Sequence, residues 1–373
     1  MDAQNNFSAR YARACRTIEG CMQGPLLDHF RDPRTVELAA NPNGTLWVEK
    51  LGDKMRLAYD SRQNAQTWTQ WKERMFLIIS CVAGVLGAEV NYGRQYVEGE
   101  FPLDGSRFEG WVPPAVAGPS FTLRKKATQI YTLAQYVEGG VITAPQLQVL
   151  EQIIRDKRNI LVAGGTGSGK TTLINALIQK FVEMCPEERP GIIEDTGELQ
   201  CSAQNMIALH SGANFSMSTA LRTMLRARPD RIIVGEVRGS EGYDLLAAWN
   251  TGHDGGFATI HANSAAKALE KFAMFCTASP ECPRRGLEDM IASTVGAVVF
   301  IKRDRAARAG RVLQEVARPV GFDGHEFRVE PLGGTLQQAA AAAAAVTAQA
   351  VARPAAVRAA VATGMVVPPR SGS

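Results

Sequence analysis

The sequence has little that would place it inside a membrane. Its longest uncharged and mostly apolar run, Met75–Ala88, is closed by Arg74 and Glu89. This run is too short to span the ~30 Å hydrocarbon core of a bilayer, so we expect it to form a buried helix. The first residues lack the basic and apolar regions of a signal peptide. We therefore expect a cytoplasmic protein whose contact with a membrane is peripheral.

Paired cysteines and a large excess of charge are also missing. The seven cysteines include no C-x-x-C pair, which argues against a disulfide framework or a zinc ribbon and predicts reduced thiols. The formal net charge is +4, and three arginines after residue 331 leave about +1 for the rest of the chain. We therefore expect nucleic-acid binding to be weak or absent. The composition is globular and excludes a fibrous protein.

Four regions are predicted along the chain, which we assign to the α/β class. Residues 1–126 mix helical spacing with short alternating strands, which predicts a small α/β domain with helices on one face of its sheet. Residues 127–143 are expected to be a hinge or linker. Residues 144–330 alternate strand-like and helical runs, which predicts a second domain with a mainly parallel sheet. Residues 331–373 are rich in alanine and are expected to form a disordered, low-complexity tail.

The sharpest motif is a glycine-rich loop at residues 164–171, which fits G-x-x-x-x-G-K-[ST] between an apolar strand and a helical pattern. Backbone N–H groups in such a loop attract phosphate oxygens. We expect Lys170 to reach the β- and γ-phosphates of a nucleoside triphosphate, Thr171 to offer its hydroxyl to Mg²⁺, and Thr172 to donate to the α-phosphate. A plain glycine-rich turn is the alternative. The predicted nucleotide-binding residues here are Gly164, Gly165, Thr166, Gly167, Ser168, Gly169, Lys170, Thr171 and Thr172.

Two later apolar strands end in carboxylates. Residues 231–234 lead into Glu236, at the position where such a sheet places the residue that handles Mg²⁺ or polarises water. We expect Glu236 to activate water because its side chain reaches further than that of aspartate. The strand at Ile192 also ends in carboxylates, one of which we expect to orient Mg²⁺ through water or to hold the attacking water. A solvated strand end and ordinary turn chemistry are the alternatives.

Two of the five histidines lie in one segment. A glycine-rich stretch containing His253 leads into an apolar strand that ends at His261. Because ligands bind at the carboxyl edge of a parallel sheet, we expect His261 to sense the γ-phosphate through a hydrogen bond. The spacing matches no zinc motif. A histidine satisfied within the protein's packing is the alternative.

Four segments in this order resemble a known family. Residues 164–171, 192–199, 231–239 and 251–265 are similar to the Walker A, Asp, Walker B and His boxes of the secretion or traffic ATPases, hexameric RecA-like proteins of secretion, pili and conjugation. Within that family, NPNGTLWVEKLG, LDGSRFEG and FTLRKK resemble the N-terminal domain of the conjugal-transfer ATPases of type IV secretion systems. The resemblance covers about residues 25 to 330.

This resemblance implies an ATP hydrolase that uses Mg²⁺ and powers type IV secretion or conjugal transfer. It implies a homo-oligomer, expected to be a hexamer, and inner-membrane secretion proteins as partners. It assigns catalysis to Glu236, the Asp-box carboxylates to Glu194 and Glu198, and the γ-phosphate side to His261, whose loop His253 would support.

The resemblance also draws attention to arginines. Arg107 and Arg124 match arginines that the family's N-terminal domain presents to phosphates, and Arg238 is a weaker candidate for the side of a neighbouring subunit. A solvated strand arginine is the alternative. The sequence has no four-cysteine zinc module, and its tail lies outside the family pattern. A pilus or type II secretion ATPase, an ATP-gated scaffold with little turnover and a DNA-pumping motor remain as other functions.

Overall fold

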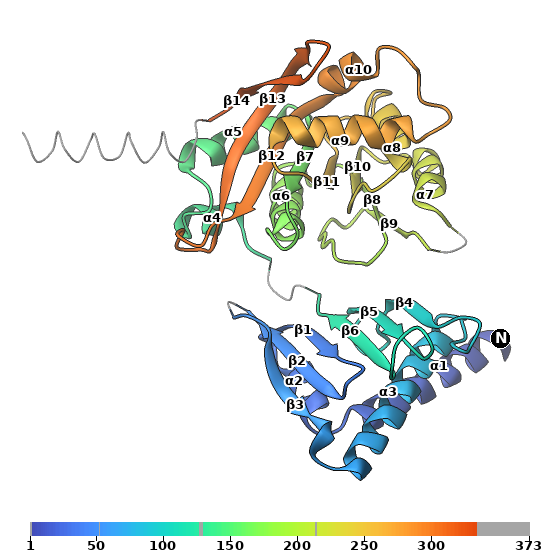
Figure 1. Ribbon diagram of the computed structural model, residues 1–373. Helices are drawn as coiled ribbons and strands as arrows, with labels where there is room; N and C mark the ends of the chain where they lie inside the picture. The colour runs from blue at the N-terminus through green and yellow to red at the C-terminus, as the bar shows by residue number, and fades with distance from the viewer. Residues whose placement is uncertain (1, 52, 127–129, 213–214, 334–373) are drawn as a thin grey trace, which may run out of the picture. The chain divides into compact units, whose positions relative to one another are not determined.

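The computed structural model describes residues 2–51, 53–126, 130–212 and 215–333 (Figure 1). The chain divides into two compact units. The N-terminal unit contains residues 1–130 and 194–200, and the C-terminal unit contains residues 131–193 and those from 201 onward. Most of the predicted tail lies outside the described residues.

The N-terminal unit is built on a six-stranded sheet of order β3-β2-β1-β6-β5-β4, whose neighbouring strands are antiparallel. Its strands are β1 (Thr35–Ala40), β2 (Thr45–Lys50), β3 (Arg56–Asp60), β4 (Tyr96–Glu100), β5 (Arg107–Trp111) and β6 (Ser120–Arg124). Its helices are α1 (Asp2–Met22), α2 (Pro25–Arg31), η1 (Ser61–Gln63) and α3 (Ala65–Val85).

Helices cover one face of this sheet. Phe108 of β5 and Leu123 of β6 pack in one cluster with Met22 of α1 and Met75 of α3. The intervening strand residues face away, because side chains alternate between the two faces of a sheet. The predicted α/β domain with helices on one face is confirmed. Most of Met75–Ala88 falls in α3, as expected, but only one side of this helix is buried, since Phe76 and Leu77 are 44% and 43% exposed. No helix in the described part of the chain is long and apolar enough to cross a membrane.

The C-terminal unit contains an eight-stranded sheet of order β14-β13-β12-β7-β11-β10-β8-β9. The strands from β12 to β8 pair in parallel, whereas β13 and β14 are antiparallel additions. The strands are β7 (Asn159–Gly164), β8 (Pro190–Glu194), β9 (Ile207–His210), β10 (Arg231–Val234), β11 (Phe257–His261), β12 (Val295–Arg303), β13 (Arg311–Phe322) and β14 (Phe327–Pro331). The mainly parallel sheet predicted from the sequence is therefore confirmed.

Helices bury both faces of the parallel strands, so all six residues of β7 are buried. Leu161 and Ala163 pack in a cluster with Trp249 of α8 and Phe272 of α9. Ile160 points to the opposite face, on which α6 packs. The helices are α4 (Leu133–Glu138), α5 (Ala144–Arg155), α6 (Lys170–Met184), α7 (Met217–Met224), η2 (Leu225–Ala227), α8 (Glu241–Trp249), α9 (Ala265–Thr277) and α10 (Leu287–Thr294).

Part of the predicted linker at 127–143 is ordered within the C-terminal unit. A capping box between Thr132 and Gln135 begins α4, and Leu313 of β13 donates its backbone N–H to the Val141 carbonyl over 2.7 Å. Local capping and this strand contact therefore make a helical segment where glycines had suggested only a hinge.

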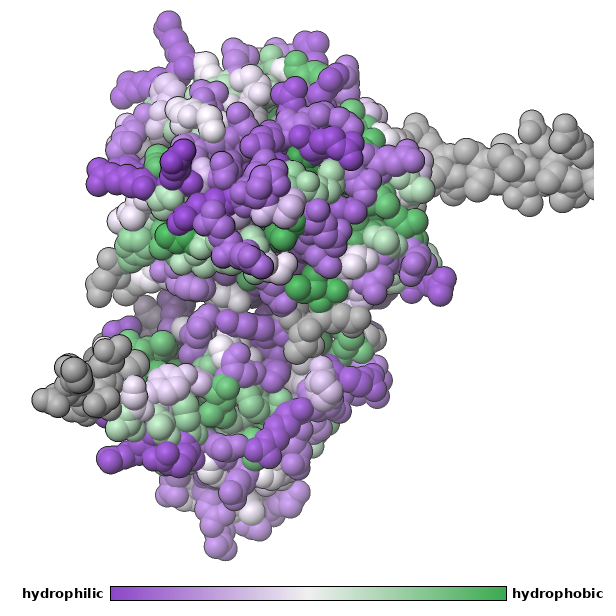
Figure 2. All heavy atoms as spheres, turned by 180° about the vertical axis from the view of Figure 1, so that it is seen from behind, coloured by the Kyte–Doolittle hydropathy of each residue, from purple (hydrophilic) through white to green (hydrophobic). Residues whose placement is uncertain are grey.

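Figure 2 shows mainly hydrophilic residues on the visible face of the C-terminal unit, with hydrophobic residues in small separate patches.

Arg231, at the start of β10, generates a prediction about stability. Its side chain has no exposed area, pairs with Glu188 and donates to the carbonyls of Ile154 and Gly255 over 3.0 and 3.2 Å. Arg231→Ala leaves these buried acceptors without their donor, so we expect a loss of about 3 kcal/mol in the free energy of unfolding. Scanning calorimetry of the full chain should show a lower Tm for the unfolding of the C-terminal unit.

Arg318→Ala is the matched control, because the Arg318–Glu330 pair is more than half exposed. We expect it to change stability by less than about 1 kcal/mol. Equal effects of the two variants would contradict a structural role for the buried arginine.

Candidate functional site

The register of the parallel sheet brings three predicted segments to one edge. In the pairing of β7 with β11, His261 lies opposite Gly164, where the glycine-rich loop begins. On the other side of β11, Val234 of β10 pairs with Ala258, so Glu236 follows at the same end of the sheet. The carboxyl edge of a parallel sheet is where such folds bind ligands.

The glycine-rich loop has the backbone of an anion cradle. Gly167 and Gly169 have φ angles of 64° and 101°, in the left-handed region that favours glycine. Helix α6 begins immediately afterwards, and its N-cap, Gly169, makes no side-chain cap. The hydroxyl of Ser168 is buried and has no hydrogen-bond partner among the described residues. Thr171 and Thr172 lie in the uncapped first turn, where N–H groups attract an anion.

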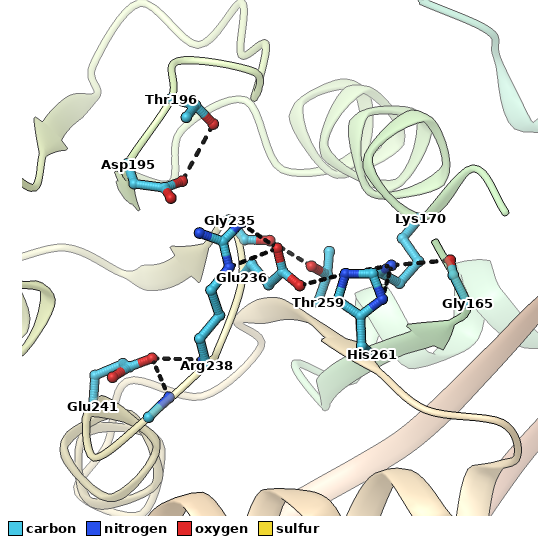
Figure 3. A network of polar contacts seen from close by, with 11 residues as sticks. Gly165, Lys170, Asp195, Thr196, Gly235, Glu236, Arg238, Glu241, Thr259 and His261 are labelled. Atoms are coloured by element: carbon cyan, nitrogen blue, oxygen red, sulfur yellow. Dashed lines mark hydrogen bonds and ion pairs between the residues drawn. The ribbon is translucent and has the colours of Figure 1, made fainter. Parts of the chain in front are cut away.

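Lys170, His261, Glu236 and Arg238 form a chain of polar contacts (Figure 3). Lys170 Nζ lies 3.3 Å from the Gly165 carbonyl and 3.1 Å from His261 Nδ1. His261 Nε2 lies 2.8 Å from Glu236 Oε1. The Arg238 guanidinium donates to Glu236 Oε2 over 3.0 Å from Nε and 2.6 Å from Nη2. Positive and negative groups thus alternate across the sheet edge, with the imidazole between them.

Neighbouring elements fix the segment that carries Glu236. The Thr259 hydroxyl of β11 donates to the Gly235 carbonyl over 2.6 Å, and Val237 donates its N–H to the Thr259 carbonyl over 2.9 Å. The Glu241 carboxylate accepts the backbone N–H groups of Arg238 and Gly239 over 2.6 and 2.8 Å. Glu236 therefore projects from a backbone tied to both β11 and the start of α8.

His261 is electrostatically biased towards its neutral form. Burial lowers the pKa of His261, the positive charge of Lys170 lowers it further, and Glu236 opposes both effects. Lys271 and Arg238 add smaller shifts that also lower this pKa. The ammonium of Lys170 can only donate, and its Nζ lies 3.1 Å from Nδ1 and 3.5 Å from Nε2, so a neutral imidazole would accept from Lys170 through Nδ1, its nearer nitrogen.

The Asp-box carboxylates have structural partners of their own. Glu194 is 4% exposed, and its Oε2 accepts the backbone N–H groups of Glu198 and Leu199 over 2.6 and 2.9 Å. This carboxylate therefore shapes the turn that carries Glu198. The predicted roles of Glu194 and Glu198 toward Mg²⁺ stay predictions.

Arg107 and Arg124 lie in the N-terminal unit. They are direct cross-strand partners in β5 and β6, with Glu37 of β1 opposite Arg124 on its other side. Their role toward phosphates stays a prediction, as does the supporting role of His253, whose Nδ1 is buried without a hydrogen-bond partner in the described part of the chain.

Two further arginines beside the loop were missed from the sequence. Arg303 of β12 donates from Nε to the Gly167 carbonyl over 2.7 Å, and Arg311 of β13 lies against Gly169. The available signal was the basic stretch at residues 302–311, where Lys302, Arg305 and Arg308 accompany these two. It carried no information about pairing, because β12 and β13 were not predicted.

Comparison with known proteins identifies the class of molecule that this site belongs to. Residues 107–344 match the model of the type II/IV secretion system protein family, which covers more than half of the chain. The chain belongs to this family. The matched region includes the glycine-rich loop, Glu236 and His261.

Individual relatives include proteins of conjugal transfer and of type IV secretion. The chain is 37% identical over 320 residues to the conjugal transfer protein TrbB of Rhizobium radiobacter, covering 86% of this chain and 94% of that one. It is 32% identical over 309 residues to the type IV secretion system protein PtlH of Bordetella pertussis, covering 74% and 87%. The fold is similar to that of the Legionella pneumophila ATPase DotB, with a TM-score of 0.54, 18% identity and 77% of each chain covered.

The lowered pKa of His261 gives a testable prediction. Its imidazole should titrate below its usual range, so near pH 6.5 the unfolded chain binds more protons than the folded one. The stability from neutral His261 is then fully present above pH 6.5 and is lost as pH falls through the folded pKa. NMR titration of the imidazole C–H signals, assigned with His261→Gln, measures this pKa.

Substitution of the two neighbours should shift this pKa in opposite directions. Lys170→Ala removes a positive charge and should raise the pKa of His261, whereas Glu236→Gln removes a negative charge and should lower it. Shifts of the same sign in both variants would contradict the polar chain.

Proposed function

We propose that this protein hydrolyses ATP to power a type IV secretion or conjugal-transfer system, working as a hexameric motor. The polar chain Lys170–His261–Glu236 at the edge of the parallel sheet carries this proposal, because it places a phosphate-binding cation and a potential general base on opposite sides of one imidazole. Membership of the secretion family and the similarity to TrbB support the assignment to secretion and conjugation.

The glycine-rich loop fits the triphosphate of ATP. Its two left-handed glycines and the uncapped first turn of α6 supply backbone N–H groups, and Lys170 supplies a cation that is 8% exposed. The buried, unpartnered Ser168 hydroxyl offers a further polar contact. Thr171 would offer its hydroxyl to Mg²⁺, and Glu194 or Glu198 would orient the ion through water or hold the attacking water; when bound, Mg²⁺ would neutralise charge on the phosphate oxygens.

Before hydrolysis, the γ-phosphate would accept hydrogen bonds from the ammonium of Lys170, which in this structure faces His261 and Gly165. His261 Nδ1 would then be able to contact the phosphate, while Nε2 keeps its contact with Glu236. Glu236 would take a proton from the attacking water, since its Oε1 lies at the end of the polar chain and Oε2 is held by Arg238. His261 would thereby connect the state of the γ-phosphate with the orientation of the base.

Force would come from loss of the γ-phosphate. We propose that Arg107 and Arg124 of the N-terminal unit contact phosphates, so that hydrolysis changes the position of this unit about the linker at 127–143. Arg238 would act toward a neighbouring subunit. The motor would work in the cytoplasm, peripheral at the inner membrane, with inner-membrane secretion proteins as partners.

Glu236→Gln separates a motor from an ATP-gated scaffold. The amide keeps the size of the side chain but is no base, so we expect turnover to fall about a hundredfold or more. Binding of Mg-ATP, measured by calorimetry, should remain within about threefold of the parent protein. Glu270→Gln on the partly exposed surface of α9 is the control. In an ATP-gated scaffold, neither substitution would change the low rate of turnover.

A ring predicts a second behaviour. If neighbouring subunits complete the site, turnover per chain should rise cooperatively with protein concentration as the ring assembles. Turnover is measured alongside light scattering, which reports the mass of the assembly. A constant rate per chain across a range in which monomers convert to larger species would contradict a shared site.

A further inference from the structure

The β12–β13 hairpin lies along one side of the glycine-rich loop. In the sheet order, β12 lies on the side of β7 away from β11, so this flank is opposite His261. β12 ends at Arg303 and β13 begins at Arg311, and the two residues are direct partners in the antiparallel ladder. Cross-strand partners extend from the same face of a sheet. We refer to Arg303 and Arg311 as the arginine pair.

Both guanidinium groups lie against left-handed glycines of the loop. Arg303 Nε donates to the Gly167 carbonyl over 2.7 Å, and a Cβ atom at Gly167 would overlap the same guanidinium. A Cβ atom at Gly169 would overlap Nη1 of Arg311. The arginine pair thus contacts the two positions at which the loop adopts the backbone of an anion cradle.

The charges of this arrangement are unfavourable without an anion. Like charges directly opposite each other destabilise an antiparallel pair. Within the described residues, neither guanidinium forms an ion pair with a carboxylate. Lys170 and the N-terminus of α6 add further positive potential close by. Phosphate groups in the loop would neutralise this concentration of charge.

The hairpin presents the pair from a short, closed turn. Asp304 donates its backbone N–H to the Gly310 carbonyl over 3.0 Å, and its carboxylate accepts the Ala306 N–H over 2.9 Å. The other two arginines of this turn, Arg305 and Arg308, are exposed. The turn therefore supplies matched controls that have the same charge but lie outside the contact with the loop.

We propose that the arginine pair positions the glycine-rich loop and sets its affinity for the phosphates of a nucleotide. A carbonyl oxygen that faced the phosphates would repel them, and Arg303 engages the carbonyl of Gly167 instead. The two guanidinium groups also attract the phosphates of any nucleotide, whichever nucleobase it carries. This inference rests on the proposed function and adds two positioning residues to its nucleotide site.

The test is Mg-ATP binding by the full chain, measured by titration calorimetry at low and high salt. Arg303→Gln and Arg311→Gln are compared with Arg305→Gln and Arg308→Gln. We expect Kd to rise about tenfold for Arg303→Gln and less for Arg311→Gln, with a weaker dependence on salt, because a charged donor has been lost. Without nucleotide, the Tm of both variants should be no lower than that of the controls, because each substitution removes one of two opposed like charges.

Arg303→Lys separates charge from geometry. Lysine keeps the charge but lacks the planar donor array, so we expect the salt dependence to return without the full affinity. Equal Kd values for the pair and the controls would overturn the inference, as would a loss of binding that only follows a lower Tm. Failure of the parent protein to bind Mg-ATP would overturn the proposed function itself, a result distinct from either of these.

Discussion

The parallel pairing of β7 with β11 on one side and β12 on the other is the constraint on which the site depends. It sets His261 beside Gly164 and the arginine-bearing hairpin on the opposite flank of the loop. A shift of one residue in either pairing would turn these side chains to the other face of the sheet. Buried Asn159 at the start of β7 opposes such a shift, because its amide donates to the Thr294 carbonyl before β12 over 2.9 Å and accepts the Gly256 N–H before β11 over 3.0 Å.

This geometry places opposing charges in a fixed order around the loop. On the β11 side, Lys170 and Glu236 are separated by a histidine whose pKa is lowered. On the β12 side, two arginines and the N-terminus of α6 concentrate positive potential. In the proposed function, the first arrangement would respond to the γ-phosphate, and the second would add to the affinity for nucleotide that the loop and Lys170 supply.

The sequence predicted the elements that carry local signals. The motif at 164–171 and the apolar strands before Glu236 and His261 located the loop and the strand ends, because glycine spacing and strand periodicity depend on residues that are close in the sequence. Pairing between distant strands has no such local pattern, so β13, β14 and the contact of Arg303 with Gly167 were missed. The turn made by Glu194 depends on backbone N–H groups that no side-chain pattern reveals. Capping by Thr132 likewise ordered part of a predicted linker.

Whether nucleotide binds at the glycine-rich loop can be measured as the affinity of Mg-ATP for the parent chain and for Lys170→Ala, with Lys180→Ala on the same helix as a control. We expect the parent and the Lys180 variant to bind alike and Lys170→Ala to lose roughly tenfold or more in affinity, since the ammonium would make charged hydrogen bonds with the phosphates. Equal affinity of all three proteins would mean that nucleotide does not bind at this loop.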